Sequence, residues 1–256
     1  VENRYPTSME RLVSSVAYRL TLSGSLSEIE TMKTIKPLAL PDIPPDGGTV
    51  TAVTVQKKDP DRCSIYLDEK FAFGIHVDLV LEAGLKKDLR LTEDECRELV
   101  SRDLYFKAMK RCMSFIAYRP RTEFEIRTRL KELGVPEEIS QRVMDRMLDQ
   151  GYLNDKEFAR QWAETRSRSK GFGPLRLQME LQKKGIDQEL AREAILDICS
   201  DELVLKNLQD QMKRAIHRYR RDVDVTTKKR KIVGFLSRRG FSTADIFKQM
   251  DEHKIS

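Results

Sequence analysis

The sequence lacks the patterns that membrane, secreted and metal-binding proteins require. No apolar run approaches the ~20 residues that a bilayer-spanning helix needs. Arg11 and Arg19 interrupt the N-terminal stretch, so we read no secretory signal there. The three histidines are scattered, and the cysteines at 63, 96, 112 and 199 form no Cys-x-x-Cys pair. These absences predict a cytoplasmic protein with reduced thiols and with no metal, cofactor or membrane association.

Nucleotide-hydrolysing and dinucleotide-binding motifs are also missing. The sequence contains no Gly-x-x-x-x-Gly-Lys-Ser/Thr loop, and Gly171-x-Gly173 follows a predicted helix rather than a strand. Asp and Glu are plentiful, and a two-metal nuclease could in principle be assembled from them. Nearly all of them, however, lie at predicted helix starts or beside Lys and Arg at helical spacing, where capping and solvation explain them. We therefore predict that the protein is not an enzyme.

Aromatic residues are scarce, at 7%, whereas charged residues make up 34% of the 256 residues. This balance is typical of a helical chain with much solvated surface, in one or two domains. The net charge of +6 makes contact with a polyanion plausible. Positive charge is concentrated in two stretches. Residues 166–184 hold six basic residues and one acidic residue, and residues 219–239 hold eight basic and two acidic residues.

One short helical unit, Arg119–Gly134, organises the chain. Pro120 ends the preceding helix, because it has no N–H to donate. Thr122 and Glu125 have the spacing of a capping box that starts a new helix, and Gly134 supplies the left-handed residue that ends it. Apolar residues recur between them at helical spacing: Ile126, Leu130 and Leu133.

The same unit returns twice, about fifty residues apart. Leu130-Lys-Glu-Leu-Gly134 is matched by Leu181-Gln-Lys-Lys-Gly185 and by Leu236-Ser-Arg-Arg-Gly240. In each copy an apolar residue lies eight positions before the glycine and another follows it directly. Each copy also leads into a further amphipathic helix. The pattern predicts a mostly α fold of tandem three-helix repeats, and because such repeats touch only their neighbours, an elongated and curved body.

The region before the repeats has the sequence pattern of a small antiparallel β-subdomain. Thr49–Val55, Cys63–Leu67 and Phe71–Phe73 are strand-like, and turn-forming residues separate them. Three of its aromatic residues could stack on nucleic-acid bases or form the core face of the sheet, and we favour the core: Tyr66, Phe71 and Phe73.

These patterns divide the chain into five parts. Residues 1–48 are a flexible arm or linker, since proline and glycine gather between 37 and 48. Within the arm Met9–Leu26 could form a frayed helix, and Met32 is a candidate initiator. The other parts are the β-subdomain (49–91), a connecting helix with the first three-helix module (92–166), the second module (167–218) and the third module (219–256). Trp162, the sole tryptophan, is predicted to anchor the core of the first module.

Four motifs in order carry a family resemblance. They are Arg119-Pro-Arg-Thr-Glu-x-Glu-Ile126, Leu130-x-x-x-Gly134, Tyr152-Leu-Asn-Asp155-x-x-Phe158-Ala159, and Gly171-x-Gly-Pro174 leading to Leu181-x-x-Lys184-Gly185-Ile186. With these motifs the chain resembles the RecX family of bacterial recombination regulators, closely over 105–200 and loosely over 201–256. The predicted hairpin resembles the N-terminal extension of some longer members.

The resemblance implies a protein that binds the RecA recombinase, above all its filament on single-stranded DNA. Family members commonly inhibit strand exchange, ATP hydrolysis and the co-protease role of RecA in DNA repair and the SOS response, and some bind DNA themselves. The family has no catalytic residues to transfer, and we expect a monomer. The alternative is a stand-alone protein that binds single- or double-stranded DNA through its basic helices. Our candidate contacts with the partner or DNA are Arg168, Lys170, Arg176, Lys183, Lys184, Lys228, Lys229, Arg230, Lys231, Arg238 and Arg239.

Overall fold

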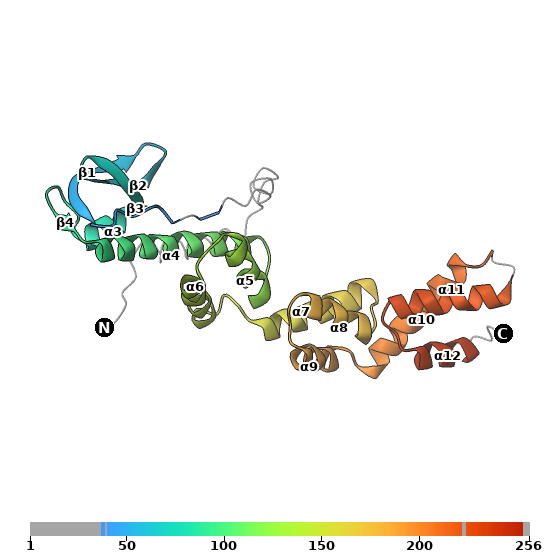
Figure 1. Ribbon diagram of the computed structural model, residues 1–256. Helices are drawn as coiled ribbons and strands as arrows, with labels where there is room; N and C mark the ends of the chain where they lie inside the picture. The colour runs from blue at the N-terminus through green and yellow to red at the C-terminus, as the bar shows by residue number, and fades with distance from the viewer. Residues whose placement is uncertain (1–36, 39, 222–223, 253–256) are drawn as a thin grey trace. The chain divides into compact units, whose positions relative to one another are not determined.

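The computed structural model describes residues 37–252 except 39, 222 and 223 (Figure 1). The possible helix Met9–Leu26 and the candidate initiator Met32 lie outside these residues. The described chain contains ten helices and four strands and forms two compact units. The first unit runs to Pro120 and includes Ile126–Tyr152, and the second comprises Arg121–Glu125 and the described residues from Leu153 onward. The prediction of a mostly helical fold with a small antiparallel sheet is confirmed.

The sheet has four antiparallel strands in the order β3-β2-β1-β4. These strands are β1 (Gly48–Gln56), β2 (Asp59–Leu67), β3 (Lys70–His76) and β4 (Arg90–Leu91), with α3 (Val77–Glu82) after β3. A sheet this small needs a partner to pack on. Its core continues into Cys96, Leu99 and Val100 of the long helix α4 (Glu93–Tyr118), which lies along the sheet in Figure 1.

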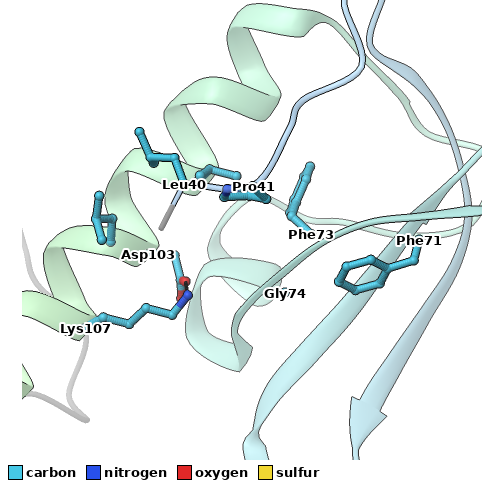
Figure 2. Close-up of a pocket in the computed structure, with 9 residues that line it drawn as sticks. Leu40, Pro41, Phe71, Phe73, Gly74, Asp103 and Lys107 are labelled. Carbon is cyan, nitrogen blue, oxygen red and sulfur yellow. Dashed lines mark ion pairs between the residues drawn. The ribbon is translucent and has the colours of Figure 1, made fainter. Parts of the chain in front are cut away.

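A buried carboxylate ties the sheet to α4. Asp103, whose side chain is 3% exposed, accepts two hydrogen bonds of 2.9 Å from the guanidinium of Arg62 on β2. It also pairs with Lys107 Nζ at 2.8 Å and accepts the backbone N–H of His76 at 3.0 Å. Figure 2 shows Lys107 reaching Asp103 beside a hollow of about 190 Å³ between β3, α4 and the segment at Leu40. Since the buried charge is fully partnered, we assign it a structural role.

The aromatic residues of the sheet do not all face its core. Phe73 is buried as predicted, but Phe71 is 59% exposed and Tyr66 is half-buried, so the prediction is wrong for Phe71. The cause is an irregularity in the ladder: Ile65 pairs with Phe73 while the next residue, Tyr66, pairs with Phe71. The extra residue, Ala72, turns inward beside Phe73 and leaves Phe71 outside, where it contacts Tyr66 edge to face at 5.9 Å.

The remaining helices repeat one arrangement, as predicted. They are α5 (Glu123–Glu132), α6 (Glu137–Asp149), α7 (Asp155–Lys170), α8 (Pro174–Lys183), α9 (Gln188–Ile198), α10 (Asp201–Arg218), α11 (Val225–Arg238) and α12 (Thr243–Glu252). The three repeat glycines follow α5, α8 and α11. All three have the left-handed backbone predicted for a helix end, with φ of 69° at Gly134, 79° at Gly185 and 89° at Gly240.

The cores group the helices differently from the predicted boundaries after 166 and 218. Phe158 and Ala163 of α7 share a core with Leu177 of α8 and with α9. Likewise, α10 shares a core with α11 and α12. Each of these modules therefore begins one helix earlier than predicted, because the glycine spacing fixes the period of a repeat but not its starting point. Trp162 accordingly packs half-buried on the second core and stacks on Phe158 at 5.7 Å.

Candidate nucleic-acid interface

The start of α8 meets the end of α11 through backbone contacts. The N–H of Gly173 donates to the carbonyl of Arg239 at 2.8 Å, and the N–H of Leu175 donates to the carbonyl of Gly240 at 3.2 Å. A Cβ on Gly240 would overlap the backbone N and Cα of Arg176. Glycine at this position therefore lets the second and third modules approach closely, in addition to ending α11.

An open hollow of about 440 Å³ lies beside this contact. Four arginines and three aromatic residues line it, and none of the lining residues that the structure describes is acidic. The lining residues are Phe172 and Arg176 from the second module, and Arg218, Tyr219, Phe235, Arg238 and Arg239 from the third. Arginine with aromatic rings is the composition of surfaces that bind nucleic-acid phosphates and bases.

Arg239 holds the centre of this cluster. Its Nη1 donates to the carbonyl of Lys170 at 2.9 Å, and its guanidinium lies 5.6 Å from the ring centroid of Phe172 and 5.1 Å from that of Phe235. Burial lowers the pKa of Arg239, and the neighbouring charges of Arg214 and Arg218 lower it further. Because like charges are crowded here, an anion in the hollow would relieve their repulsion.

Arg176 and Arg218 also lie against aromatic rings. Arg176 lies 5.6 Å from the centroid of Phe172 and donates through Nε to Glu180 at 3.1 Å. Arg218 and Lys231 each lie 5.9 Å from the centroid of Tyr219. Cation–ring contacts of this kind hold the guanidinium groups in place while leaving N–H donors for a ligand.

The fold thus brings part of the predicted contact set together. Arg176, Arg238 and Arg239 line one hollow, Lys231 lies next to it, and Lys170 contributes its carbonyl to the same cluster. That any of these residues contacts a ligand stays a prediction.

Other predicted contacts have partners within the protein or lie elsewhere on its surface. Arg168 pairs with Glu164 at 3.2 Å, and Lys184 pairs with Glu125 at 2.6 Å while lying 5.4 Å from the centroid of Trp162. Intramolecular pairing accounts for these two side chains without a ligand. Lys183 and Arg230 are exposed, and Lys228 and Lys229 are half-buried on the first turns of α11.

Sequence reasoning missed four lining residues: Phe172, Arg218, Tyr219 and Phe235. One signal was available, because Phe235 precedes Arg238 by three residues and so shares a face of α11 with it. Phe172 also lies inside the Gly-Phe-Gly-Pro loop that starts α8. Nothing in the sequence, however, places α10 beside the start of α8.

Family models match the chain in four consecutive segments. "Regulatory protein RecX N-terminal domain" matches residues 48–92. The first, second and third three-helix domains of RecX match 108–147, 154–195 and 201–250. A regulatory protein RecX from Bacillus velezensis is 34% identical over 194 residues, which cover 75% of this chain and 72% of that protein. The chain belongs to the RecX family.

Further RecX proteins agree with this membership. Regulatory protein RecX of Bacillus subtilis is 31% identical over 209 residues, covering 79% of this chain and 76% of that protein. A crystal structure of a regulatory protein RecX has the same fold, with a TM-score of 0.63, 24% identity and coverage of 80% of this chain and 98% of that one. The crystal structure of RecX from Lactobacillus salivarius gives a TM-score of 0.53 with 25% identity, over 59% of this chain and 97% of that one.

The family segments 154–195 and 201–250 coincide with the α7–α9 and α10–α12 cores rather than with the boundaries that we predicted from the sequence. In the part of the chain that the structure describes, no helix has the length and apolarity needed to span a membrane.

Proposed function

We propose that this protein is a non-catalytic regulator that binds the RecA recombinase or its filament on single-stranded DNA. It mainly inhibits the recombinase, ATPase and co-protease activities of RecA in DNA repair and the SOS response. The observation that carries this proposal is the match of all four RecX segments, in order, along the chain. The relatives are named regulatory proteins rather than enzymes, which supports a non-catalytic role.

Regulation of this kind requires a difference in affinity. A ligand that binds two filament states equally shifts nothing, so the protein must bind one state of the RecA filament more tightly than the other. Tandem modules suit such a partner, because a filament offers the same protomer surface repeatedly and linked contacts raise the overall affinity.

The test is a titration of the protein into RecA while single-stranded-DNA-dependent ATP hydrolysis and strand exchange are followed. We expect both rates to fall and to level off once the filament sites are filled. A second titration with excess single-stranded DNA is the control, since inhibition by covering bare DNA would be reversed and inhibition through RecA would persist. Unchanged RecA rates at saturating protein would contradict the proposal.

A stand-alone DNA-binding protein is the second candidate, and the arginine-lined hollow favours it. Neutralising the basic run Lys228–Lys231 with glutamine separates the two functions. Loss of DNA binding with RecA inhibition intact would show that the two activities use different residues. Each lost phosphate contact should also lower the logarithmic salt slope by about 1. A matched control removes the same charge from exposed positions of the first unit: Lys86, Lys87, Lys110 and Arg111.

A further inference from the structure

The hollow between α8 and α11 lies across the joint between the second and third modules. We infer that it binds one nucleotide of a single-stranded nucleic acid, with the phosphate on the arginines and the base against the aromatic side chains, and that the bound nucleotide holds this joint closed. The inference rests on the second candidate function given above, DNA binding, and is independent of any contact with RecA.

Charge favours an anionic ligand. Among the residues that the structure describes, the lining carries four guanidinium groups and no carboxylate. Glu180 engages Arg176, but no carboxylate of the described residues forms an ion pair with Arg218, Arg238 or Arg239. Phosphate oxygens match the planar donors of arginine in pairs, so they are the anion that this lining is best equipped to hold.

The three aromatic rings of the lining favour a nucleotide. A carboxylate-rich peptide would need arginine but no aromatic lining, whereas a nucleotide uses both, because its base stacks on aromatic or guanidinium planes. Here Phe172, Tyr219 and Phe235 lie against the guanidinium groups within one hollow. A volume of about 440 Å³ lies within the range of about 300–1,000 Å³ common for small-ligand sites.

Stacking on these rings favours a single strand over a duplex. In a duplex both faces of each base are stacked on neighbouring bases, so only a single strand can offer a base face to the rings without unstacking. The hollow is also lined from three helix ends rather than by one continuous helix face, which suits a splayed nucleotide better than a groove of double-stranded DNA.

The joint itself runs through the same residues. Arg239 accepts the Gly173 N–H through its carbonyl and donates to the Lys170 carbonyl through its side chain. Arg176 comes from the second module and Arg218 from the third, so a phosphate between them bridges the two modules. A ligand that binds only the closed joint stabilises that state, and neutralising the crowded arginines adds to the effect.

Binding is tested by fluorescence anisotropy on the full chain with a labelled oligothymidine, against a duplex, thymidine monophosphate and polyglutamate as competitors. We expect Arg238→Gln to weaken binding about 10-fold, as loss of a charged hydrogen bond does. Arg192→Gln removes the same charge from an exposed side chain of α9 and should change the affinity less than about twofold. Phe235→Leu keeps an apolar side chain and should weaken binding about 5- to 100-fold. Phe247→Leu, at an exposed side chain of α12, should leave the affinity unchanged.

Coupling to the joint is tested by amide hydrogen exchange. The Gly173 and Leu175 amides, which bond across the joint, should exchange more slowly with oligothymidine bound. The Ile186 amide, which bonds to Leu181 within the second module, serves as the reference. In Arg238→Gln the slowing should disappear. Unchanged exchange at Gly173 and Leu175 when the oligonucleotide is bound would overturn the coupling.

Four binding results would overturn the ligand assignment. A duplex bound as tightly as the single strand would exclude base stacking. Polyglutamate competing with the same dependence on Arg238 would identify an acidic protein segment as the partner. If thymidine monophosphate competes at the same concentration as the unlabelled oligonucleotide, the ligand of the hollow is a free nucleotide rather than a nucleic-acid strand. Equal affinity of Arg238→Gln and Arg192→Gln would remove the hollow from the binding site altogether.

Discussion

Gly134 and Gly240 occupy the same position of the repeat but lie in different surroundings. Both end a helix with a left-handed backbone. A Cβ on Gly134 would meet nothing within 4 Å, whereas a Cβ on Gly240 would overlap the backbone of Arg176. Gly185 resembles Gly240, because its Cβ would overlap the side chain of Phe124. Gly134 therefore only ends a helix, whereas Gly185 and Gly240 also allow the start of another helix to pack closely against them.

The carbonyl just before each of the three glycines accepts a hydrogen bond, and the donor differs from module to module. The Arg239 carbonyl accepts the Gly173 N–H at 2.8 Å, and the Lys184 carbonyl accepts the Thr122 hydroxyl at 2.7 Å. The Leu133 carbonyl accepts the N–H of Leu38 at 2.8 Å. The glycine end is thus a docking position in every module, and in the first module the segment before the sheet fills it. A repeat can keep one contact while changing the group that makes it, because any N–H or O–H satisfies a helix-end carbonyl.

The largest effect should come from filling the crowded glycine end. Gly240→Ala is expected to destabilise the second unit by about 3 kcal/mol or more, because the left-handed penalty of about 1–2 kcal/mol is joined by about 1–3 kcal/mol of overpacking. Gly134→Ala is the matched control and should cost only the left-handed penalty of about 1–2 kcal/mol, because a Cβ there meets no other atom within 4 Å. Urea unfolding followed by circular dichroism, with Trp162 fluorescence for the second unit, measures both. Equal losses in the free energy of unfolding at the two positions would show that the contact between Gly240 and Arg176 adds no strain.

A smaller effect should follow from removing the hydroxyl at the second docking position. Thr122 is buried, and its Oγ accepts the Glu125 N–H at 3.2 Å while donating to Lys184. Thr122→Val should cost about 2–3 kcal/mol, since it loses a cap and leaves a carbonyl unpaired. Thr92→Val is the control: Thr92 makes an exposed capping box with Glu95, and its loss should cost about 1 kcal/mol. If the two variants lose the same stability in urea unfolding, the bond to Lys184 contributes nothing.

The contact in the first module should be weaker still. Leu38→Pro removes the N–H that reaches the Leu133 carbonyl and should cost the first unit about 1 kcal/mol, the usual net value of one hydrogen bond. Leu38→Ala keeps the N–H and controls for the side chain. Urea unfolding followed by circular dichroism gives the stability, and limited proteolysis before the sheet gives the local opening. Equal proteolysis of the two variants would argue that this bond does not hold the segment.

The features that the sequence predicted correctly depend on local chemistry. Gly134, Gly185 and Gly240 are read directly, because a helix end needs a left-handed residue and the spacing between them is visible in the chain. The strands of the β-subdomain follow in the same way from β-branched residues and turns. The basic stretches are equally visible, but they do not reveal that Lys184 is already paired with Glu125.

What the sequence could not supply depends on contacts between distant residues. The hollow needs Arg239 beside the carbonyl of Lys170, 69 residues earlier, and no periodicity reports that contact. The inward turn of Ala72, which leaves Phe71 exposed, arises from a register shift between strands rather than from either strand alone. The starting point of each module was missed for the same reason, since only packing shows that α7 belongs with α8 and α9.

The smallest effect concerns Asp155, which accepts a hydrogen bond from Glu123 at the start of α5, next to Thr122. Its carboxylate accepts the Glu123 N–H at 3.0 Å, and burial raises its pKa, with a further rise from the charges of Glu123 and Glu125. A carboxyl whose pKa is higher in the folded state binds its proton more tightly there, so its cost to stability is present at neutral pH and is relieved as the pH falls toward about 4. Asp155→Asn keeps an acceptor and removes the charge, so it should be as stable as the parent at neutral pH, or more stable by up to about 1 kcal/mol. The parent should regain that difference on acidification, as followed by Trp162 fluorescence in urea. A parent that instead loses stability relative to Asp155→Asn as the pH falls would mean that the ionised carboxylate stabilises this contact, and the burial argument would be wrong.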